Sequence, residues 1–175
     1  MTAPALTLDQ INRMESREFS RVFGRVFEHS PWIAERSLTA RPFASIEALH
    51  QAMCAVVRQA SAPEQRALLV AHPALAGREA LAGELTPEST REQAAAGLDA
   101  LSRAEMDHIS RMNQVHAERF GFPFIIAVRL NTKARIFSEF ERRLALDQAA
   151  EERACLEQVY LITGLRLREL VSAQD

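Results

Sequence analysis

Apolar side chains recur at helical spacing along most of this 175-residue chain. Leu49 and Met53 illustrate the pattern within 46–60, because residues three or four apart share one face of an α-helix. A second long run, 148–171, continues the pattern almost to the C-terminus. The segment FPFIIAVRLN at 122–131 is rich in β-forming residues, but the sequence offers it no partner strand. We therefore predict an all-α protein in which 122–131 is a buried extended connector or a short helix.

Polar residues mark where the helices begin. Thr7 with Gln10, and Ser102 with Glu105, have the spacing of a capping box, in which each side chain bonds the other residue's backbone N–H. Further helix starts are predicted at Ser16, Ser30-Pro31, Ser45, Pro63 and Thr132, with a stop at Gly121. No repeat, linker or low-complexity tract interrupts the chain. The pattern predicts a compact bundle of about eight helices and a single domain over residues 1–175.

Composition and charge exclude several function classes. The chain is 47% hydrophobic and 25% charged, as soluble globular domains are. Its net charge of −2 argues against broad electrostatic binding of nucleic acid. Its apolar runs are too short to span a bilayer, and its ends carry neither a secretory signal nor a peroxisomal tripeptide. We expect a cytoplasmic protein with no nucleic-acid or membrane partner.

The stretch LLVAHPALAG at 68–77 places a histidine where a helix must end. Pro73 disfavours α-helical geometry in the residue before it, so His72 is pushed toward an extended conformation. A helix C-terminus favours a protonated imidazole, and a nearby carboxylate would favour it further. From this context alone, His72 is either a working histidine or a residue that only terminates the helix.

The remaining histidines and the two cysteines do not form a metal site. His108 and His116 are eight residues apart, roughly 12 Å along a helix, so they cannot bind one metal directly. Cys54 and Cys155 have no metal-type spacing, and neither H-E-x-x-H nor C-x-x-C occurs. His29 and His50 read as structural residues in this pattern, the latter within an amphipathic helix. We predict no bound metal.

Ser89, Glu92 and Gln93 lie on one helix face, because they are spaced i, i+3 and i+4. One interpretation is structural, since Ser-x-x-Glu is also the pattern of a capping box. The other is functional. A helix N-terminus presents free N–H groups to a small anion, while Glu92 serves catalysis and its neighbours hold the ligand. Spacing alone leaves both interpretations open.

Five sequence blocks decide between these interpretations by resemblance. They are FGRVFEHSPWIAERS, LLVAHPALAG, LTPESTREQAAAGLDAL, NQVHAERFGFPFIIAVRLNTKARIFSEFERRL and ITGLRL. In this order and spacing the chain resembles the OHCU decarboxylases, the 2-oxo-4-hydroxy-4-carboxy-5-ureidoimidazoline decarboxylases of ureide formation from urate. The resemblance covers most of the 175 residues. One departure is Ala74, where the family often has Asp.

The resemblance implies a fold, a reaction and a set of residues. It implies an all-α enzyme, usually a homodimer, that uses no metal or organic cofactor and converts its ureidoimidazoline substrate to (S)-allantoin. It makes His72 and Glu92 the catalytic residues. The substrate contacts that it implies are Pro73, Ser89, Thr90, Arg91, Glu92, Gln93, Phe124, Ile125, Ile126, Ala127, Val128 and Arg166, with Arg168 close to the last position.

The absence of a cofactor motif suits this chemistry. Decarboxylation leaves an electron pair that many enzymes pass to pyridoxal phosphate or thiamine. Here the substrate carries an imine-like C=N bond beside the leaving carboxylate, so the protein supplies placement, proton transfer and charge stabilisation. Two other readings stay open: a helical binding or scaffold protein without catalysis, and a related enzyme acting on another ureide.

Overall fold

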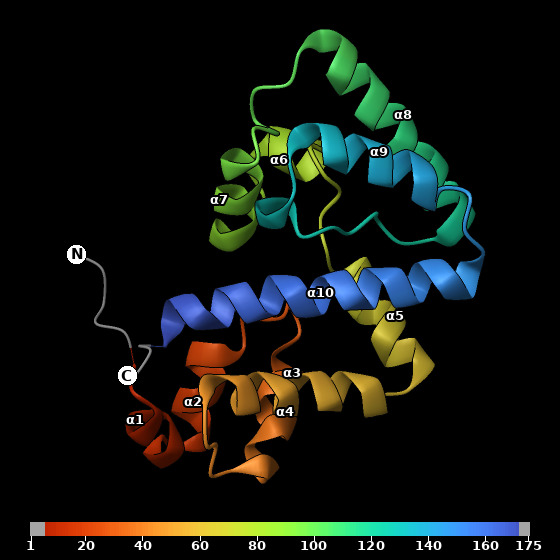
Figure 1. The fold of residues 1–175 in the computed structure, drawn as a ribbon. Helices are drawn as coiled ribbons and strands as arrows, with labels where there is room; N and C mark the ends of the chain where they lie inside the picture. The colour runs from red at the N-terminus through yellow and green to blue at the C-terminus, as the bar shows by residue number, and fades with distance from the viewer. Residues whose placement is uncertain (1–5, 172–175) are drawn as a thin grey trace. The chain divides into compact units, whose positions relative to one another are not determined.

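The structure, a computed structural model, describes residues 6–171. Within this range it contains ten α-helices and two short 3-10 helices and no strand, so the all-α prediction is confirmed (Figure 1). Eight of the ten α-helices have seven or more residues, in line with the predicted number. The outermost residues, on which our reading of targeting signals partly depends, lie outside the described range. None of the described helices is long and apolar enough to cross a membrane.

The chain divides into two compact units. The first holds residues up to Ala71 together with those from Tyr160 onward, and the second is His72–Val159. The elements in order are α1 (Leu8–Arg13), α2 (Ser16–Phe23), α3 (Pro31–Ser37), η1 (Leu38–Ala40), α4 (Ile46–Gln59), α5 (Ala62–Val70), α6 (Arg78–Ala82), α7 (Pro87–Ala95), α8 (Arg103–Phe120), η2 (Val128–Leu130), α9 (Lys133–Arg143) and α10 (Gln148–Leu170). Helix α10 thus begins in the second unit and ends in the first. A single domain over 1–175 stays a prediction.

The first unit is built from short helices around an apolar centre. Helix α3 packs against both α2 and α4. Phe19 and Phe23 of α2 are buried with their ring centroids 4.6 Å apart. Leu49 and Met53 of α4 are fully buried, as the helical spacing predicts. At the edge of this unit Leu6 and Val171 form one isolated parallel bridge, which ties the two ends of the described chain together.

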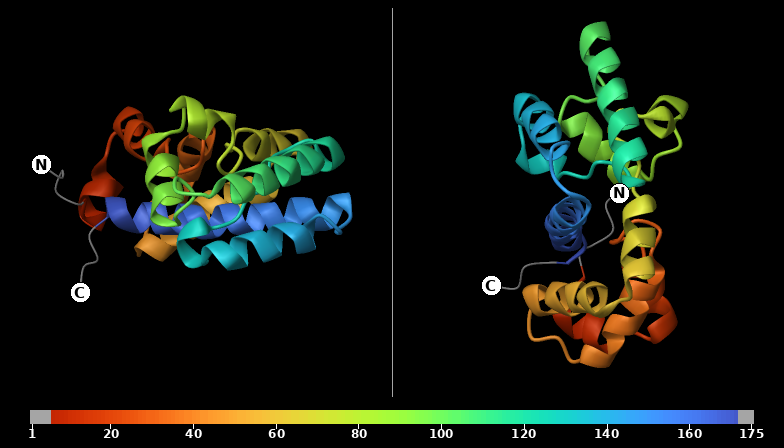
Figure 2. Two further views of the ribbon diagram at one scale, coloured as in Figure 1. Left: turned by 90° about the horizontal axis from the view of Figure 1, so that it is seen from above. Right: turned by 90° about the vertical axis from the view of Figure 1, so that its right-hand side faces the viewer.

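The second unit surrounds the segment that we predicted to be irregular. Residues 122–127 are in neither a helix nor a strand and continue into η2, so the segment is a buried connector that ends in a short 3-10 helix. Helix α9 and the start of α10 run in opposite directions and are joined by a tight turn (Figure 2). The core of this unit consists of Leu75, Ala76, Leu98, Ile109, Met112, Phe124, Ile126, Val128, Ile136 and Phe140.

Most of the predicted helix starts are confirmed. Thr7–Gln10 and Ser102–Glu105 form capping boxes, and Ser45 caps α4 through its side chain. Starts at Ser16, Pro31 and Thr132 also agree with the structure, and Gly121 ends α8 at a φ of 75°. The start predicted at Pro63 falls one residue late, because Ser61 forms a capping box with Glu64 and α5 begins at Ala62.

The capping-box interpretation of Ser89 and Glu92 is wrong. Helix α7 begins at Pro87, and its N-cap is Thr86, whose hydroxyl accepts the Ser89 N–H at 3.3 Å. Proline at the first helical position has a backbone angle already suited to the helix and lacks the N–H that would otherwise be unsatisfied. The Thr-Pro pair therefore starts the helix before Ser89 is reached, and Ser89 lies inside the first turn.

Candidate functional site

The loop between α5 and α6 carries His72 and is fastened to two helices of the second unit. The N–H of Ala76 donates to Oε1 of Gln93 on α7 at 2.8 Å. The carbonyl of Leu75 accepts from Nδ2 of Asn113 on α8 at 2.9 Å. His72 itself is buried, with 8% of its surface exposed. The loop that holds His72 is therefore directly bonded to the helix that holds Glu92.

Two small residues give this loop its shape. Ala76 has a φ of 45°, in the left-handed region that costs a residue with a Cβ about 1–2 kcal/mol. Its bond to Gln93 helps to hold that conformation. A Cβ added to Gly77 would lie 2.8 Å from the Cβ of Ala74, closer than real carbon atoms approach. The backbone conformation at Ala76 and the lack of space at Gly77 therefore restrict which residues fit at the end of HPALAG.

Helix α7 presents the predicted set of polar residues on its inner face. Ser89 and Gln93 are buried, and Glu92 is half-buried. Thr90 and Arg91, which lie between them in sequence, are exposed. The i, i+3, i+4 spacing thus matches the side of the helix that faces the protein. Of these side chains, the amide of Gln93 is bonded to the His72 loop.

The connector, which we define as residues 122–128, lies in the same unit. Its residues Phe124 to Val128 are all buried, and η2, which continues it, packs against α7. The rings of Phe124 and Phe140 are stacked with centroids 3.9 Å apart. Leu75 and Ala76 of the His72 loop belong to the same apolar cluster as the connector. The loop, α7 and the connector, three segments predicted to share a site, therefore come together.

A buried polar cluster bonds two backbone carbonyls of the connector. The sequence did not suggest this cluster. The side chain of Arg143 binds Glu151 through two bonds, Nε to Oε2 at 2.9 Å and Nη2 to Oε1 at 2.6 Å. Its Nη1 donates to the carbonyl of Ile125 at 2.7 Å. His116 lies between the carbonyl of Phe122 and Oε1 of Glu151, each 2.9 Å away. We call Arg143, Glu151 and His116 the buried triad.

The charge of Glu151 is stabilised within the buried triad. Burial alone would raise the pKa of Glu151, but hydrogen bonds from His116 and Arg143 outweigh it and lower that pKa below its ordinary value. Glu151 is therefore ionised. Both ring nitrogens of His116 lie within hydrogen-bond distance of an oxygen atom of the protein. Next to the triad, burial raises the pKa of the Cys155 thiol to about 12, so this sulfur stays protonated.

Arg166, the predicted arginine contact, belongs to the first unit. It is buried, and its Nη1 donates to Oε2 of Glu28 at 2.8 Å. Arg168, the neighbouring candidate, is 63% exposed and lies 4.0 Å from Glu47. The two arginines thus differ sharply in how firmly they are held. A substrate contact for either one stays a prediction.

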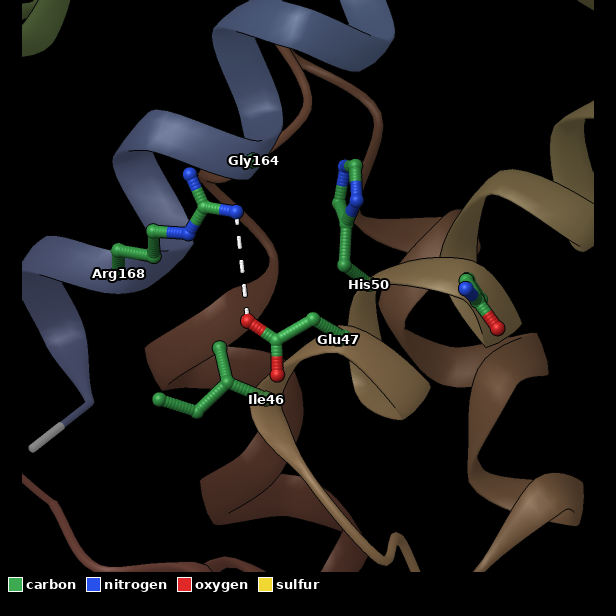
Figure 3. A pocket seen from close by; sticks show the side chains of 6 residues that line it. Ile46, Glu47, His50, Gly164 and Arg168 are labelled. Atoms are coloured by element: carbon green, nitrogen blue, oxygen red, sulfur yellow. Dashed lines mark ion pairs between the residues drawn. The ribbon is translucent and has the colours of Figure 1, made fainter. Parts of the chain in front are cut away.

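Arg168 lines a small hollow of the first unit, of about 110 Å³, that includes Glu47, His50 and Gly164 (Figure 3). The Nε2 of His50 lies 3.0 Å from the hydroxyl of Thr163, and a Cβ at Gly164 would come within 3.3 Å of the His50 ring. Burial, followed by the charge of Arg168, lowers the pKa of His50. His50 is thus a packed, neutral residue, as its helix position suggested.

Comparison with known proteins identifies the family. The model of the OHCU decarboxylase family matches residues 12–168. The chain belongs to this family. It is 43% identical to a 2-oxo-4-hydroxy-4-carboxy-5-ureidoimidazoline decarboxylase of Haloferax volcanii, over 97% of this chain and 98% of the relative. It is 38% identical to the enzyme of the same name from Mus musculus, over 95% of this chain and 93% of the relative.

Solved structures agree with this assignment. A crystal structure of (S)-allantoin synthase superposes with a TM-score of 0.77 at 28% identity, covering 97% of this chain and 56% of that one. A crystal structure of OHCU decarboxylase in the presence of (S)-allantoin gives a TM-score of 0.70 at 20% identity, a likeness of fold. The chain is therefore a decarboxylase by family, and its fold is one that the family uses.

The buried triad left one signal in the sequence. Glu151 lies four and eight residues before Cys155 and Val159, which are fully buried, so it occupies the apolar stripe of α10. A carboxylate in such a stripe needs a cationic partner. Which residues supply it cannot be read from spacing, because His116 is 35 positions away.

Proposed function

We propose that this decarboxylase converts 2-oxo-4-hydroxy-4-carboxy-5-ureidoimidazoline to (S)-allantoin, the last step of urate oxidation to allantoin, without a metal or organic cofactor. The observation that carries the proposal is the family match over residues 12–168. The fold supports it, since the His72 loop is bonded to α7 and shares a buried cluster with the connector. These are the segments that the resemblance makes responsible for the chemistry.

The reaction needs placement more than it needs an external electron sink. The bond between the ring carbon and its carboxylate breaks, and carbon dioxide leaves. The electron pair of that bond forms a C=C bond to the adjacent C=N carbon, while the π pair of the C=N bond moves onto its nitrogen, which takes a proton. The ring carbon that keeps the hydroxyl is then part of an enol. Loss of the hydroxyl proton and protonation of the neighbouring carbon then give allantoin. Delivery of that last proton to one face sets the handedness of the product.

Residues of the second unit and Arg166 of the first are assigned to these steps. We assign proton transfer with the substrate hydroxyl and ring to His72, a role that typically contributes about 10²–10⁴-fold in rate. Glu92 orients the same region of the substrate and tunes the imidazole, while Ser89 and Gln93 hold the ligand from the same helix face. Arg166 is assigned to an anionic or carbonyl oxygen, a task that suits a guanidinium fork.

The connector would contact the substrate through its backbone groups. Phe124 to Val128 are buried, and residues 122–127 are not in a regular helix, so their backbone groups are not all used by secondary structure. Such groups suit the amide and ureido edges of this substrate. The apolar side chains around them would keep water away from a compound that also decays without stereocontrol.

A coupled assay tests this function. Urate is mixed with uricase and hydroxyisourate hydrolase, so that the substrate is formed in place, and circular dichroism follows the optical activity of allantoin. We expect this protein to accelerate the appearance of (S)-allantoin. Allantoin that forms at the uncatalysed rate and as a racemate would reject the proposal and favour a scaffold protein or an enzyme for another ureide.

We further propose that the protein is a cytoplasmic homodimer, as the resemblance implies. Leu81 and Leu130 of the second unit are large apolar residues that are exposed in the single chain, which is compatible with a partner surface. Light scattering coupled to size-exclusion chromatography tests the assembly. A mass of twice 19.6 kDa is expected, and a mass equal to that of one chain would reject the dimer.

A further inference from the structure

Two side chains fix the backbone of the connector on either side of Ile126. The carbonyl of Ile125 accepts from Nη1 of Arg143 at 2.7 Å, and the N–H of Ala127 donates to Oε1 of Gln158 at 2.9 Å. Arg143 and Gln158 line the same hollow, of about 190 Å³, together with Ile126. Arg143 and Gln158 thus bond the connector from the same side, one at the residue before Ile126 and one at the residue after it.

The planar trans peptide converts these two bonds into a direction for Ile126. In a trans peptide the C=O and the N–H point in opposite directions. Because the Ile125 carbonyl points to Arg143, the N–H of Ile126 points away from it. Because the Ala127 N–H points to Gln158, the carbonyl of Ile126 points away from that residue. Ile126 is buried, and within residues 6–171 its N–H makes no hydrogen bond.

Both anchors rest on the frame made by α9 and the start of α10. Glu151 and Gln158 are seven residues apart, two turns of α10, so they lie on the same helix face. Glu151 fixes the plane of the Arg143 guanidinium through two bonds, and His116 fixes the carbonyl of Phe122. The ring of Phe124 also lies 4.4 Å from the Arg143 guanidinium carbon. The frame, together with His116 of α8, therefore holds the connector at Phe122, Phe124, Ile125 and Ala127.

We infer that Arg143 and Gln158 are positioning residues for the reaction. They hold the connector so that Ile126 presents an outward N–H donor and C=O acceptor, a pair that complements the amide edge of a ureide. This inference rests on the proposed function, because it needs that substrate on the far side of the connector. Neither side chain touches the reacting atoms, and their effect passes through the backbone.

Gln158 gives the cleaner test, because it is only half-buried and uncharged. Gln158→Leu removes the acceptor for the Ala127 N–H, whereas Gln158→Glu keeps an oxygen at the same place. Gln148→Leu is the matched control. Gln148 is also a glutamine of α10, but it donates to the carbonyl of Phe120, outside the connector. Each variant is assayed with freshly formed substrate, and its melting temperature and peptide-resolved hydrogen–deuterium exchange are measured.

We expect Gln158→Leu to raise KM about tenfold, the typical weight of one well-placed hydrogen bond, with a smaller change in kcat. Exchange of the amides in residues 124–128 should rise by a similar factor, while the melting temperature stays near that of the wild type. Gln158→Glu should restore KM. Gln148→Leu should leave both readouts unchanged.

Two failures are distinguishable. If the wild type does not accelerate the reaction, the proposed function falls, and the proposed link to this substrate falls with it, although exchange still shows whether Gln158 orders the connector. If the wild type is active but Gln158→Leu has an unchanged KM and unchanged exchange at 124–128, the positioning role is rejected. Equal loss in Gln158→Leu and Gln148→Leu also rejects it, since that pattern reports general weakening of α10.

Discussion

His72 and His116 are both buried in the second unit, yet their surroundings differ in kind. His116 is near the C-terminal end of α8, fully enclosed, with both ring nitrogens bonded inside the fold. Its ring is also surrounded by phenylalanines, the nearest being Phe120 at 4.6 Å between centroids. His72 lies on an irregular loop and keeps 8% of its surface exposed. A substrate cannot reach a ring like that of His116, so this histidine serves the fold, whereas His72 is the histidine to which we assign proton transfer.

The comparison also separates two ways of using buried charge. The triad around His116 satisfies the Glu151 carboxylate with the Arg143 guanidinium and a hydrogen bond to the His116 ring inside one compact unit. On α7, by contrast, Glu92 is only half-buried. Variants of the two regions should therefore have opposite signatures, with activity lost in one and stability lost in the other.

The largest effect is expected for His72→Gln. Loss of a proton-transfer group should lower kcat by about 10²–10⁴-fold while the protein remains folded, because glutamine fills a similar volume. Turnover of freshly formed substrate and a thermal melt measure the two quantities. His108→Gln is the control, since His108 lies on the outside of α8 beside Glu141 and should keep normal turnover. Near-normal activity of His72→Gln would remove this histidine from the mechanism.

Glu151→Ala should reduce stability instead. It leaves Arg143 buried without its counter-ion and His116 without a hydrogen-bond partner, a change that typically costs about 3–5 kcal/mol in free energy of unfolding. Arg142→Ala breaks an exposed pair with Glu139 and should cost less than about 1 kcal/mol. Urea unfolding compares the two. A cost for Glu151→Ala as small as that of Arg142→Ala would mean that the triad is not a structural element.

The same carboxylate predicts a smaller, pH-dependent effect. The pKa of Glu151 in the folded protein is lowered below its ordinary 4.5, so its stabilisation is fully present above about pH 4.5 and is lost as the pH falls through the folded value. Other carboxylates titrate in this range as well, including Glu139, whose pKa is also lowered. The measure is therefore the difference in unfolding free energy between the wild type and Glu151→Gln. That difference should shrink on acidification, and a constant difference from pH 6 to pH 3 would contradict the assignment.

The smallest effect is expected in the His72 loop. Ala76→Gly relieves backbone strain of about 1–2 kcal/mol in the folded protein. It also increases the conformational entropy of the unfolded chain, which lowers the free energy of unfolding by about 0.4–1 kcal/mol. Loss of the buried Ala76 methyl costs about 0.8 kcal/mol as well. The net result should be a change in melting temperature of no more than about 3 °C. Gly77→Ala should lower the melting temperature, because its Cβ would meet Ala74. A fall of more than about 3 °C for Ala76→Gly would show that the loop is not strained at this position.

Local signals in the sequence predicted most of the helices. Ser102 and Glu105 encode a start through their own side chains, so three-residue spacing suffices to find it. The Ser89–Glu92 pair has the same spacing, yet Thr86 and Pro87 start the helix earlier. A capping pattern is thus informative only when no stronger signal lies one turn upstream.

The candidate site was only partly accessible in this way. The proline after His72 marks an irregular loop, and periodicity puts Ser89 and Gln93 on one face of α7. Pairings across the chain were not encoded locally. Gln93 finds Ala76 across 17 positions, and Arg143 finds Ile125 across 18. Such bonds depend on how elements pack, which a single sequence does not spell out.

The two cysteines give the protein a built-in reporter. Both thiols are buried, and burial raises the pKa of Cys54 to about 11 and that of Cys155 to about 12. Alkylating reagents attack the thiolate, so neither sulfur should react while its surroundings stay closed. Cys54 belongs to the first unit and Cys155 to the second. The rate at which an alkylating reagent labels each cysteine therefore measures how often its own unit opens, without an engineered probe.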